Sequence, residues 1–225
     1  MIGSFGEAEI FSFHATKFLN TLEGGAVVTN NADLAAKIRL MKNFGFTFYD
    51  RTDYIGTNGK MNEVSAAMGL TNLESMDDFI AVNYRNYEQY QKELAEVPGI
   101  TLTSYDERER SNYQYVVLEV DQAETRVARD DLLNVLHAEN ILARRYFYPG
   151  CHRMEPYRSR FPQAGLLLPE TERLTTRVLS LPTGTAIGPG EISQVCEIIQ
   201  FVVANGREIS ARLRSALQAT QSAAK

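Results

Sequence analysis

A proline–glycine pair at Pro98-Gly99 divides the chain into two stretches with different sequence patterns. Before the pair, a tyrosine-rich helix is expected from about Asp77 to Leu94, and the pair stops it because proline and glycine break helices. After the pair, short apolar runs alternate with amphipathic stretches, which is typical of an α+β domain. We therefore expect domains at residues 1–96 and 97–206, with a tail at 207–225.

Composition and charge narrow the class of protein. The 225 residues are 44% hydrophobic and 23% charged, which is ordinary for a globular protein. A net charge of −5 provides no overall basic surface for a nucleic-acid backbone, so no nucleic-acid partner is expected. Cys151 and Cys196 lack the spacing of metal ligands or of a disulfide framework, so no metal site is expected. No apolar run reaches the roughly 18 residues of a membrane span, and no signal peptide is recognisable, so the expected location is cytoplasmic.

The first stretch begins with two short apolar runs, at Ile10–Phe13 and Ala26–Thr29, which we interpret as strands. Asn31 is a suitable cap for a helix that we expect to end near Gly45. The segment from Phe46 to Lys60 is aromatic, glycine-rich and without periodicity, so it is expected to be a loop, which at this length is often functional. A further helix is expected from Asn62.

The second stretch has the order of a mixed domain. We expect a strand, a helix, a strand, an irregular segment, a short helix, a strand and a final helix that starts at Gly188-Pro189 and ends at Gly206. The expected strands are Tyr113–Val120, Ile141–Phe147 and Val178–Leu181, and the expected first helix is Arg126–Ala138. The irregular segment runs from Pro149 to Pro169. The tail is expected to be a frayed or solvated helix.

Lys17 is the candidate for covalent chemistry. It follows the first apolar run and is surrounded in sequence by Phe11, Phe13 and Phe18. Partial desolvation by these rings would lower its pKa and make a neutral amine available for a Schiff base. Ser12, on the same segment as Lys17, has a hydroxyl that can bind an anion. The spacing also fits a surface lysine after an edge strand, and from spacing alone that interpretation is the more common one, so Lys17 remains a candidate.

A resemblance to a known family changes that balance. The segment SFHATK, residues 12–17, with EGG at 23–25, resembles the cofactor-lysine signature of the DegT/StrS family of sugar aminotransferases. The likeness covers nearly all of the chain before the tail. It continues through residues 31–45, through GTNGKMNE at 56–63 with the AAMG helix behind it, and through ARRYFYP at 143–149 to His152, Pro156 and Tyr157.

The resemblance implies an α/β protein, a fold-type I aminotransferase dependent on pyridoxal 5'-phosphate (PLP). Residues 1–96 would be the C-terminal part of its PLP-binding large domain, and 97–206 its small α+β domain. By resemblance Lys17 is the catalytic lysine that binds PLP covalently. Ser12 matches a serine that contacts the cofactor phosphate, and Asn58 an asparagine that reaches the phosphate from the partner subunit of an obligate homodimer. Tyr148 and His152 lie in the segment that faces the nucleotide sugar.

The implied function is transfer of an amino group, with glutamate as the expected donor, to a nucleotide-linked keto deoxysugar. The family's first half is missing here, including the aspartate and the aromatic residue that hold the PLP ring. The chain is therefore expected to be a fragment cut inside a longer reading frame, to be inactive alone, to bind PLP weakly and to expose apolar faces. Two alternatives stay open: a non-catalytic interaction or regulatory relic of the same fold, and a PLP-dependent sugar dehydratase. Relatives with dehydratase activity carry histidine in place of the lysine, so Lys17 favours transamination.

Overall fold

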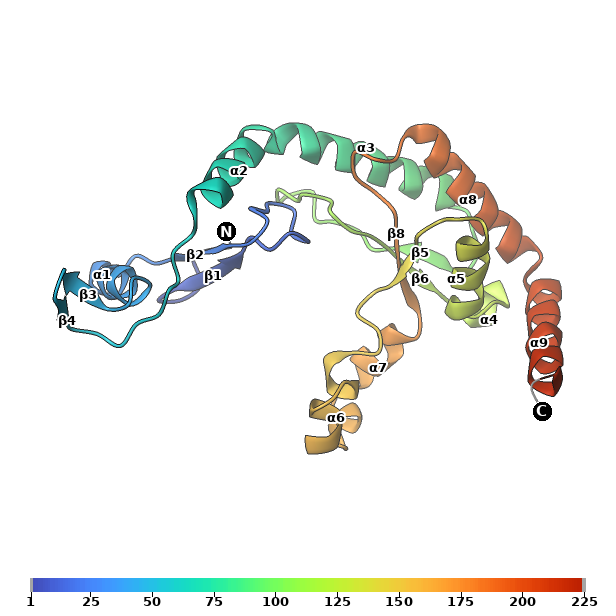
Figure 1. The fold of residues 1–225 in the computed structure, drawn as a ribbon. Coiled ribbons are helices and arrows are strands. Elements are labelled where there is room, and N and C mark those ends of the chain that lie inside the picture. Colours follow the sequence, from blue (N-terminus) through green and yellow to red (C-terminus); the bar gives the residue numbers. More distant parts are fainter. Residues whose placement is uncertain (1, 224–225) are drawn as a thin grey trace. The chain divides into compact units, whose positions relative to one another are not determined.

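The computed structural model describes residues 2–223, with side chains described up to residue 215 (Figure 1). The chain forms two compact units, Met1–Asp78 and Phe79–Lys225, called here the N-terminal and the C-terminal unit. The domain boundary expected between residues 96 and 97 concerns a longer protein, and it stays a prediction. In the described part of the chain, no helix is both long and apolar enough to cross a membrane.

The N-terminal unit is built from two small hairpins and two helices. Ser12 at the end of the first strand pairs with Gly25 at the start of the second. The helices begin where expected, because Asn31 accepts a hydrogen bond from the Leu34 amide and Asn62 from the Ser65 amide. In chain order the elements are β1 (Glu9–Ser12), β2 (Gly25–Val28), α1 (Ala32–Met41), β3 (Phe46–Phe48), β4 (Arg51–Thr52) and α2 (Glu63–Glu74).

Two expectations for this unit are wrong in detail. Helix α1 ends at Met41 rather than near Gly45, because the amides of Thr57 and Gly59 take up the carbonyls of Met41 and Lys42. The segment 46–60 is not wholly a loop, since β3 and β4 pair antiparallel within it. Strands of three and two residues are too short to produce a visible alternation in the sequence.

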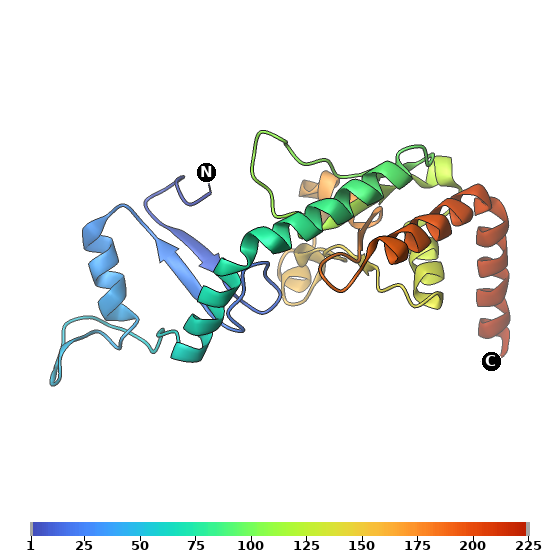
Figure 2. The same cartoon turned by 90° about the horizontal axis from the view of Figure 1, so that it is seen from above.

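The C-terminal unit holds a four-stranded antiparallel sheet in the order β5-β6-β8-β7. Helices α3 and α8 lie side by side over it (Figures 1 and 2), joined by hydrogen bonds from Gln89 to Ser193 and from Gln200 to the Glu93 carbonyl. The strands are β5 (Ile100–Leu102), β6 (Val116–Val120), β7 (Arg144–Arg145) and β8 (Val178–Leu181). The helices are α3 (Met76–Leu94), α4 (Gln122–Thr125), α5 (Arg129–Ala138), α6 (Tyr157–Arg160), α7 (Pro169–Thr175), α8 (Pro189–Ala204) and α9 (Gly206–Ala223), with two 3-10 turns, η1 (Cys151–Arg153) and η2 (Ala164–Leu167).

The two faces of this sheet have different neighbours. Val116, Leu118 and Val120 alternate into a core that they share with α3, α5 and α8. Val117 and Glu119 are only half-buried and face the other way. On that second face, residues of the sheet and of the segment 146–175 line a common cavity. Figure 1 shows α6 and α7 of this segment below the strands.

Several expected boundaries in this unit are wrong where the backbone turns. The expected helix Arg126–Ala138 begins only at Arg129, as α5, because Arg126 adopts a left-handed conformation (φ 61°) that ends the preceding short helix α4. The expected strand Ile141–Phe147 shrinks to β7, between Asn140 (φ 60°) and Phe147 (φ 48°). The strand expected from Tyr113 begins at Val116, after Tyr113 with φ 49°. By contrast, helix α8 ends at Ala204, next to the expected end at Gly206, and the tail is helical as expected, with α9 beginning at Gly206. Strand β5 was not expected.

Candidate active site

Lys17 lies in the loop between β1 and β2, residues 13–24. The loop is closed at its base by hydrogen bonds from the Phe13 amide to the Gly24 carbonyl (2.8 Å) and from the Thr21 amide to the Phe13 carbonyl (2.9 Å). Inside it, the Lys17 amide donates to the His14 carbonyl at 2.8 Å and forms a tight turn. The backbone of Lys17 is therefore held by the strands on both sides of it.

Helix α2 fixes the same loop from behind. The Asn72 side chain donates to the Asn20 carbonyl at 2.7 Å, and Thr21 is 3% exposed. A Cβ atom at Gly69 would lie 2.7 Å from the Thr21 methyl group, which is closer than side chains tolerate. Gly69 thus lets the helix approach the loop, which gives a structural purpose to the AAMG sequence.

The Lys17 side chain is exposed, so the expected desolvation by neighbouring phenylalanines is wrong for this chain. Ser12 is also exposed, and its Oγ accepts a hydrogen bond of 3.4 Å from the His14 amide. The His14 ring bonds to the Thr16 hydroxyl at 2.9 Å, and its Nε2 lies 3.7 Å from Glu23. The structure places Ser12 and Lys17 on one short segment, with His14 stabilising the turn between them.

Asn58 belongs to a different part of the N-terminal unit. It forms an isolated bridge with Asn43 just beyond α1. Gly56 allows this, because a Cβ atom there would lie 2.5 Å from the Met41 carbonyl oxygen. Among the described residues, no recorded contact joins Asn58 to the Lys17 loop. That arrangement is compatible with a residue that serves a neighbouring subunit, and the role of Asn58 stays a prediction.

Tyr148 and His152 lie in the C-terminal unit and have different surroundings. Tyr148 is stacked by two guanidinium groups, with Arg145 at 4.8 Å and Arg129 at 5.3 Å from its ring centre. His152 instead lines a cavity of about 900 Å³ on the second face of the sheet. The cavity floor comes from β6, β8 and the segments that follow β5 and precede β6, and its other wall comes from residues 146–175. We call it the aromatic cavity, because its lining includes Tyr105, Tyr115, Tyr146, Phe147, Tyr157 and Phe161.

The imidazole of His152 is held by a carboxylate. Its side chain is 8% exposed, and Nε2 lies 2.5 Å from Glu172 Oε1. Arg153 also binds Glu172, with distances of 2.8 Å and 2.5 Å to its two carboxylate oxygens. These hydrogen bonds, from Arg153 first and His152 second, lower the pKa of Glu172 to about 2. Glu172 is therefore a carboxylate at neutral pH.

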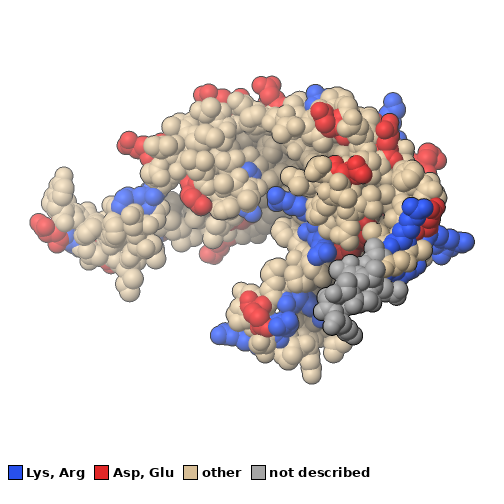
Figure 3. Space-filling model, turned by 45° about the vertical axis from the view of Figure 1, so that its right-hand side comes forward, with Lys and Arg blue, Asp and Glu red and all other residues tan. Residues whose placement is uncertain are grey.

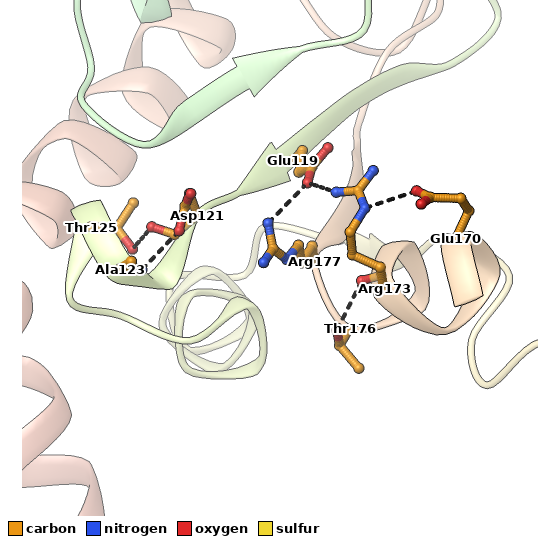
Figure 4. Close-up of polar contacts among 8 residues, drawn as sticks. All are labelled: Glu119, Asp121, Ala123, Thr125, Glu170, Arg173, Thr176 and Arg177. Carbon is orange, nitrogen blue, oxygen red and sulfur yellow. Dashed lines mark hydrogen bonds and ion pairs between the residues drawn. The ribbon is translucent and has the colours of Figure 1, made fainter. Parts of the chain in front are cut away.

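Helix α7 is anchored to the sheet as well. Glu119 of β6 pairs with Arg173 at 2.5 Å and with Arg177 at 3.5 Å, and Arg173 also binds Glu170 at 3.0 Å (Figure 4). Glu172 thus connects α7 to His152 and Arg153, and the adjacent Arg173 connects α7 to Glu119 of the sheet. Helix α7, which forms part of the cavity wall, is therefore anchored at two points.

Sequence reasoning did not identify Glu172 or the aromatic cavity. Glu172 stands in the acidic first turn of a short proline-led helix, where a negative charge is expected for the helix alone. Nothing in a sequence pattern pairs it with His152, twenty positions away in the chain. The cavity likewise requires the sheet face and the covering segment to meet.

Charged groups of both signs are interspersed on the face of the molecule seen in Figure 3. Within the described residues, no cluster of three histidine, cysteine or acidic side chains is arranged to hold a metal ion. The groups with potential chemistry described so far are Lys17 with the neighbouring hydroxyl of Ser12, and the aromatic cavity with His152.

These elements define the class of protein. The fold is that of the fold-type I PLP-dependent aminotransferases, with part of the large-domain sheet and a small α+β domain. The chain belongs to the DegT/DnrJ/EryC1/StrS aminotransferase family, whose sequence profile matches residues 1–200. PLP is the cofactor that this family implies.

Similar proteins are sugar aminotransferases. The chain is 35% identical over 204 residues to a dTDP-4-amino-4,6-dideoxy-D-glucose transaminase of Shigella dysenteriae, covering 91% of this chain and 53% of the relative. Among solved structures it is similar to DesI, analysed in the presence of its TDP-sugar product, with 50% identity, a TM-score of 0.84 and coverage of 94% and 53%. Helicobacter pylori PseC, an aminotransferase involved in pseudaminic acid biosynthesis, is 25% identical, with a TM-score of 0.80 and coverage of 91% and 55%. The chain spans about half the length of these relatives.

Proposed function

We propose that this chain is the half of a sugar aminotransferase that supplies the cofactor lysine, Lys17. In the longer protein, an amino group passes from an amino acid, expected to be glutamate, to a nucleotide-linked keto deoxysugar. The observation that carries this proposal is the Lys17 loop: its backbone is fixed by both strands and by α2, in a chain of the aminotransferase family.

The residues of this loop fit one side of PLP, which carries an aldehyde and a phosphate. Lys17 provides a primary amine for the aldehyde, and Ser12 provides a hydroxyl for a phosphate oxygen. Gly24 and Gly25 keep side chains away from the base of the loop. When bound, the cofactor supplies an electron sink that stabilises a carbanion at the neighbouring carbon. The groups that contact its ring belong to the other half of the protein.

Lys17 then has two tasks. Its Nζ first binds the cofactor and is displaced by the incoming amine. As a free amine, Nζ would take the proton from the substrate carbon that bears the amino group and pass it to the former aldehyde carbon of the cofactor. In the second half-reaction it would carry a proton from that carbon to the keto-sugar carbon that receives the amine. The second task requires a neutral amine, so we expect the other half of the protein to cover the Lys17 side chain, which is exposed in this chain.

The partner and substrate contacts follow the same proposal. A second copy of the protein completes each site, with Asn58 reaching the cofactor phosphate of its neighbour. Tyr148 and His152 contact the nucleotide sugar. A dTDP-linked sugar is the favoured substrate class, because the similar transaminase and DesI are named for sugars of that kind.

The decisive experiment joins this chain to the missing half and measures glutamate-dependent amine transfer to a dTDP-keto sugar. Lys17→Ala should abolish transfer while leaving the dimer and the circular dichroism spectrum unchanged. Lys37→Ala, which removes another exposed lysine of the same unit, should retain it. Substantial transfer by the Lys17→Ala protein would refute the proposal, and loss of water from the sugar without amine transfer would favour the dehydratase.

Cofactor attachment gives a second readout. After borohydride reduction of the joined protein with PLP, mass spectrometry should find the cofactor mass on the peptide that contains Lys17. The Lys37→Ala protein should be labelled equally, and the Lys17→Ala protein should lose the label. Labelling of another lysine in preference to Lys17 would show that the site is elsewhere. Failure of the joined dimer to take up any cofactor would favour the non-catalytic relic.

A further inference from the structure

The imidazole of His14 has no part in the function proposed above, although it lies between Ser12 and Lys17 in the chain. Its side chain is 50% exposed, so packing in a core does not account for it. The ring nevertheless has a contact at each of its two nitrogen atoms. A side chain that bonds to the backbone two residues away fixes a local turn.

Two short hydrogen-bonded turns follow one another in this part of the loop. Ser12 Oγ accepts a hydrogen bond from the His14 amide at 3.4 Å, and His14 Nδ1 accepts one from the Thr16 amide at 3.2 Å. In each turn the acceptor is a side chain two positions earlier, as in Asx and ST turns. The Lys17 amide then donates to the His14 carbonyl at 2.8 Å. Three bonds thus close the path from Ser12 to Lys17, and His14 takes part in each of them.

The Thr16 amide decides which nitrogen of the His14 ring carries the proton. An amide N–H only donates, so Nδ1 must offer its lone pair, and the proton of the neutral ring is on Nε2. Nε2 lies 3.7 Å from Glu23 Oε1, near the other end of the loop. A carboxylate at that distance favours an N–H group that faces it. The Thr16 amide and Glu23 therefore favour the same tautomer of the ring.

The first of the three bonds leaves the Ser12 hydroxyl suited to an anion. Its oxygen accepts the His14 amide, so its hydrogen is still available to donate. Phosphate oxygens accept hydrogen bonds, so the hydroxyl can bind a phosphate and keep the bond that holds the loop. Ser12 and Lys17, the two groups that this chain would present to PLP, are therefore connected through His14.

The other anchors of the loop act on other residues. The Phe13 amide and carbonyl close its base, and Asn72 of α2 donates to the Asn20 carbonyl at 2.7 Å. These bonds do not involve the His14 side chain, so its replacement should leave the base of the loop and its contact with α2 in place. A substitution at His14 is therefore a test of the turn 14–17.

We propose that His14 is a positioning residue. It acts through the Thr16 amide and holds the turn 14–17 in the form in which the Lys17 amine and the Ser12 hydroxyl reach the aldehyde and the phosphate of the same PLP molecule. The proposal rests on the proposed function for the roles of Ser12 and Lys17. It adds the residue that makes these two contacts act as one unit.

Two substitutions separate the acceptor atom from the ring. His14→Asn keeps an acceptor oxygen bonded to Cγ, which can take the Thr16 amide as in an Asx turn, whereas His14→Leu has no acceptor. In this chain without cofactor, nuclear magnetic resonance should show the Thr16 amide hydrogen exchanging about fivefold faster in His14→Leu, because one hydrogen bond is lost. His14→Asn should exchange at nearly the unchanged rate. Equal rates in His14→Leu and the unchanged protein would show that the ring does not hold this amide, and the proposal would be wrong.

Thr16→Val is the matched control for the turn. The Thr16 hydroxyl also lies near His14 Nδ1, at 2.9 Å, and this substitution removes the hydroxyl while it keeps the amide. Exchange of the amide at position 16 should stay close to unchanged. If Thr16→Val instead has the effect expected of His14→Leu, the hydroxyl holds the turn and the role assigned to the amide is refuted.

The joined dimer tests the consequence for the cofactor. His14→Leu should raise the dissociation constant of PLP and lower kcat of amine transfer, each about tenfold, because both cofactor contacts are displaced. KM for the sugar should stay nearly the same. His14→Asn should restore the dissociation constant and kcat to within about twofold of the unchanged protein, because it keeps the acceptor.

Two results in the joined dimer would overturn the proposal. Equal losses in His14→Leu and His14→Asn would mean that the imidazole itself contacts the cofactor or the substrate. Faster exchange in His14→Leu without any change in the dissociation constant or kcat would mean that the turn has no bearing on the cofactor. If the circular dichroism spectrum of His14→Leu differs from that of the unchanged protein, His14→Ala takes its place in each comparison.

Failure of the proposed function is recognised separately. It would appear as the absence of the cofactor mass on the Lys17 peptide of the unchanged joined protein, whatever residue is at position 14. The exchange of the Thr16 amide is measured without PLP, so it reports on the His14 turn in either case.

Discussion

The two units of the chain differ in how they are stabilised. Among the described residues, every buried hydrophobic side chain belongs to the C-terminal unit, from Tyr87 to Val202. The N-terminal unit buries only small or polar side chains such as Thr21 and Ser65, while Ile55 is 94% and Ile10 is 82% exposed. The unit that carries Lys17 therefore has local hydrogen bonds but, among the described residues, no apolar core of its own. In the longer dimeric protein proposed above, additional surfaces would cover its exposed apolar side chains.

The largest difference between the two units should appear in the free energy of unfolding when one aliphatic side chain is truncated in each unit. Leu179→Ala, at the centre of the buried sheet and fully buried, should lower the free energy of unfolding by about 2–5 kcal/mol. Ile55→Ala should change it by less than about 0.5 kcal/mol. Urea unfolding followed by far-ultraviolet circular dichroism measures both. Equal effects would show that the N-terminal unit has a core in solution.

A second comparison uses two glycines. Gly69→Ala forces a methyl group against Thr21 and should destabilise the anchored Lys17 loop by about 1–3 kcal/mol, seen as faster hydrogen exchange of the Thr21 amide. Gly190→Ala in α8 has open space and should be neutral or slightly stabilising. Unchanged exchange in Gly69→Ala would mean that the loop is not held by α2.

Helix caps test whether the units unfold separately. Asn62→Ala and Asp121→Ala each remove a side chain that accepts a hydrogen bond at a helix start, each worth about 1 kcal/mol (Figure 4 shows the Asp121 cap). Asp121→Ala should lower the global unfolding free energy, while Asn62→Ala should change only the hydrogen exchange of α2. A global effect of Asn62→Ala would contradict the separation.

The smallest effect is expected from pH, because Glu172 is partly exposed. The folded pKa of about 2 lies below the ordinary 4.5. The carboxylate therefore stabilises the folded state above about pH 4.5, and this stabilisation is lost as the pH falls towards 2. The difference in melting temperature between the unchanged protein and Glu172→Gln should shrink across that range, and Glu170→Gln should show a smaller change. A difference that is constant with pH would mean that the pKa of Glu172 is the same in the folded and the unfolded protein.

Local signals in the sequence predicted local structure well. The caps at Asn31 and Asn62, the strand Val178–Leu181 and the helix after Gly188 are confirmed because each depends on a few neighbouring residues. The family signature around Lys17 predicted the class of protein, which the family match confirms.

What the sequence did not predict depends on distant groups or on single backbone angles. The left-handed residues Arg126 and Tyr113 lie where the sequence pattern placed the start of a helix and of a strand, and both elements begin three residues later. Lys17 is exposed in the structure although three phenylalanines lie close to it in the sequence. The Glu172–His152 pair and the aromatic cavity arise only when a sheet face meets a segment that follows it by many residues.

The tyrosine cluster beside α3 has an optical consequence. The chain has no tryptophan, so its ultraviolet emission comes from tyrosine. Tyr87, Tyr105 and Tyr113 lie with ring centres 4.7–5.4 Å apart, close enough for excitation to pass among them. Emission anisotropy on excitation near 280 nm should thus be low in the native chain and rise when the C-terminal unit unfolds, an intrinsic signal that needs no label.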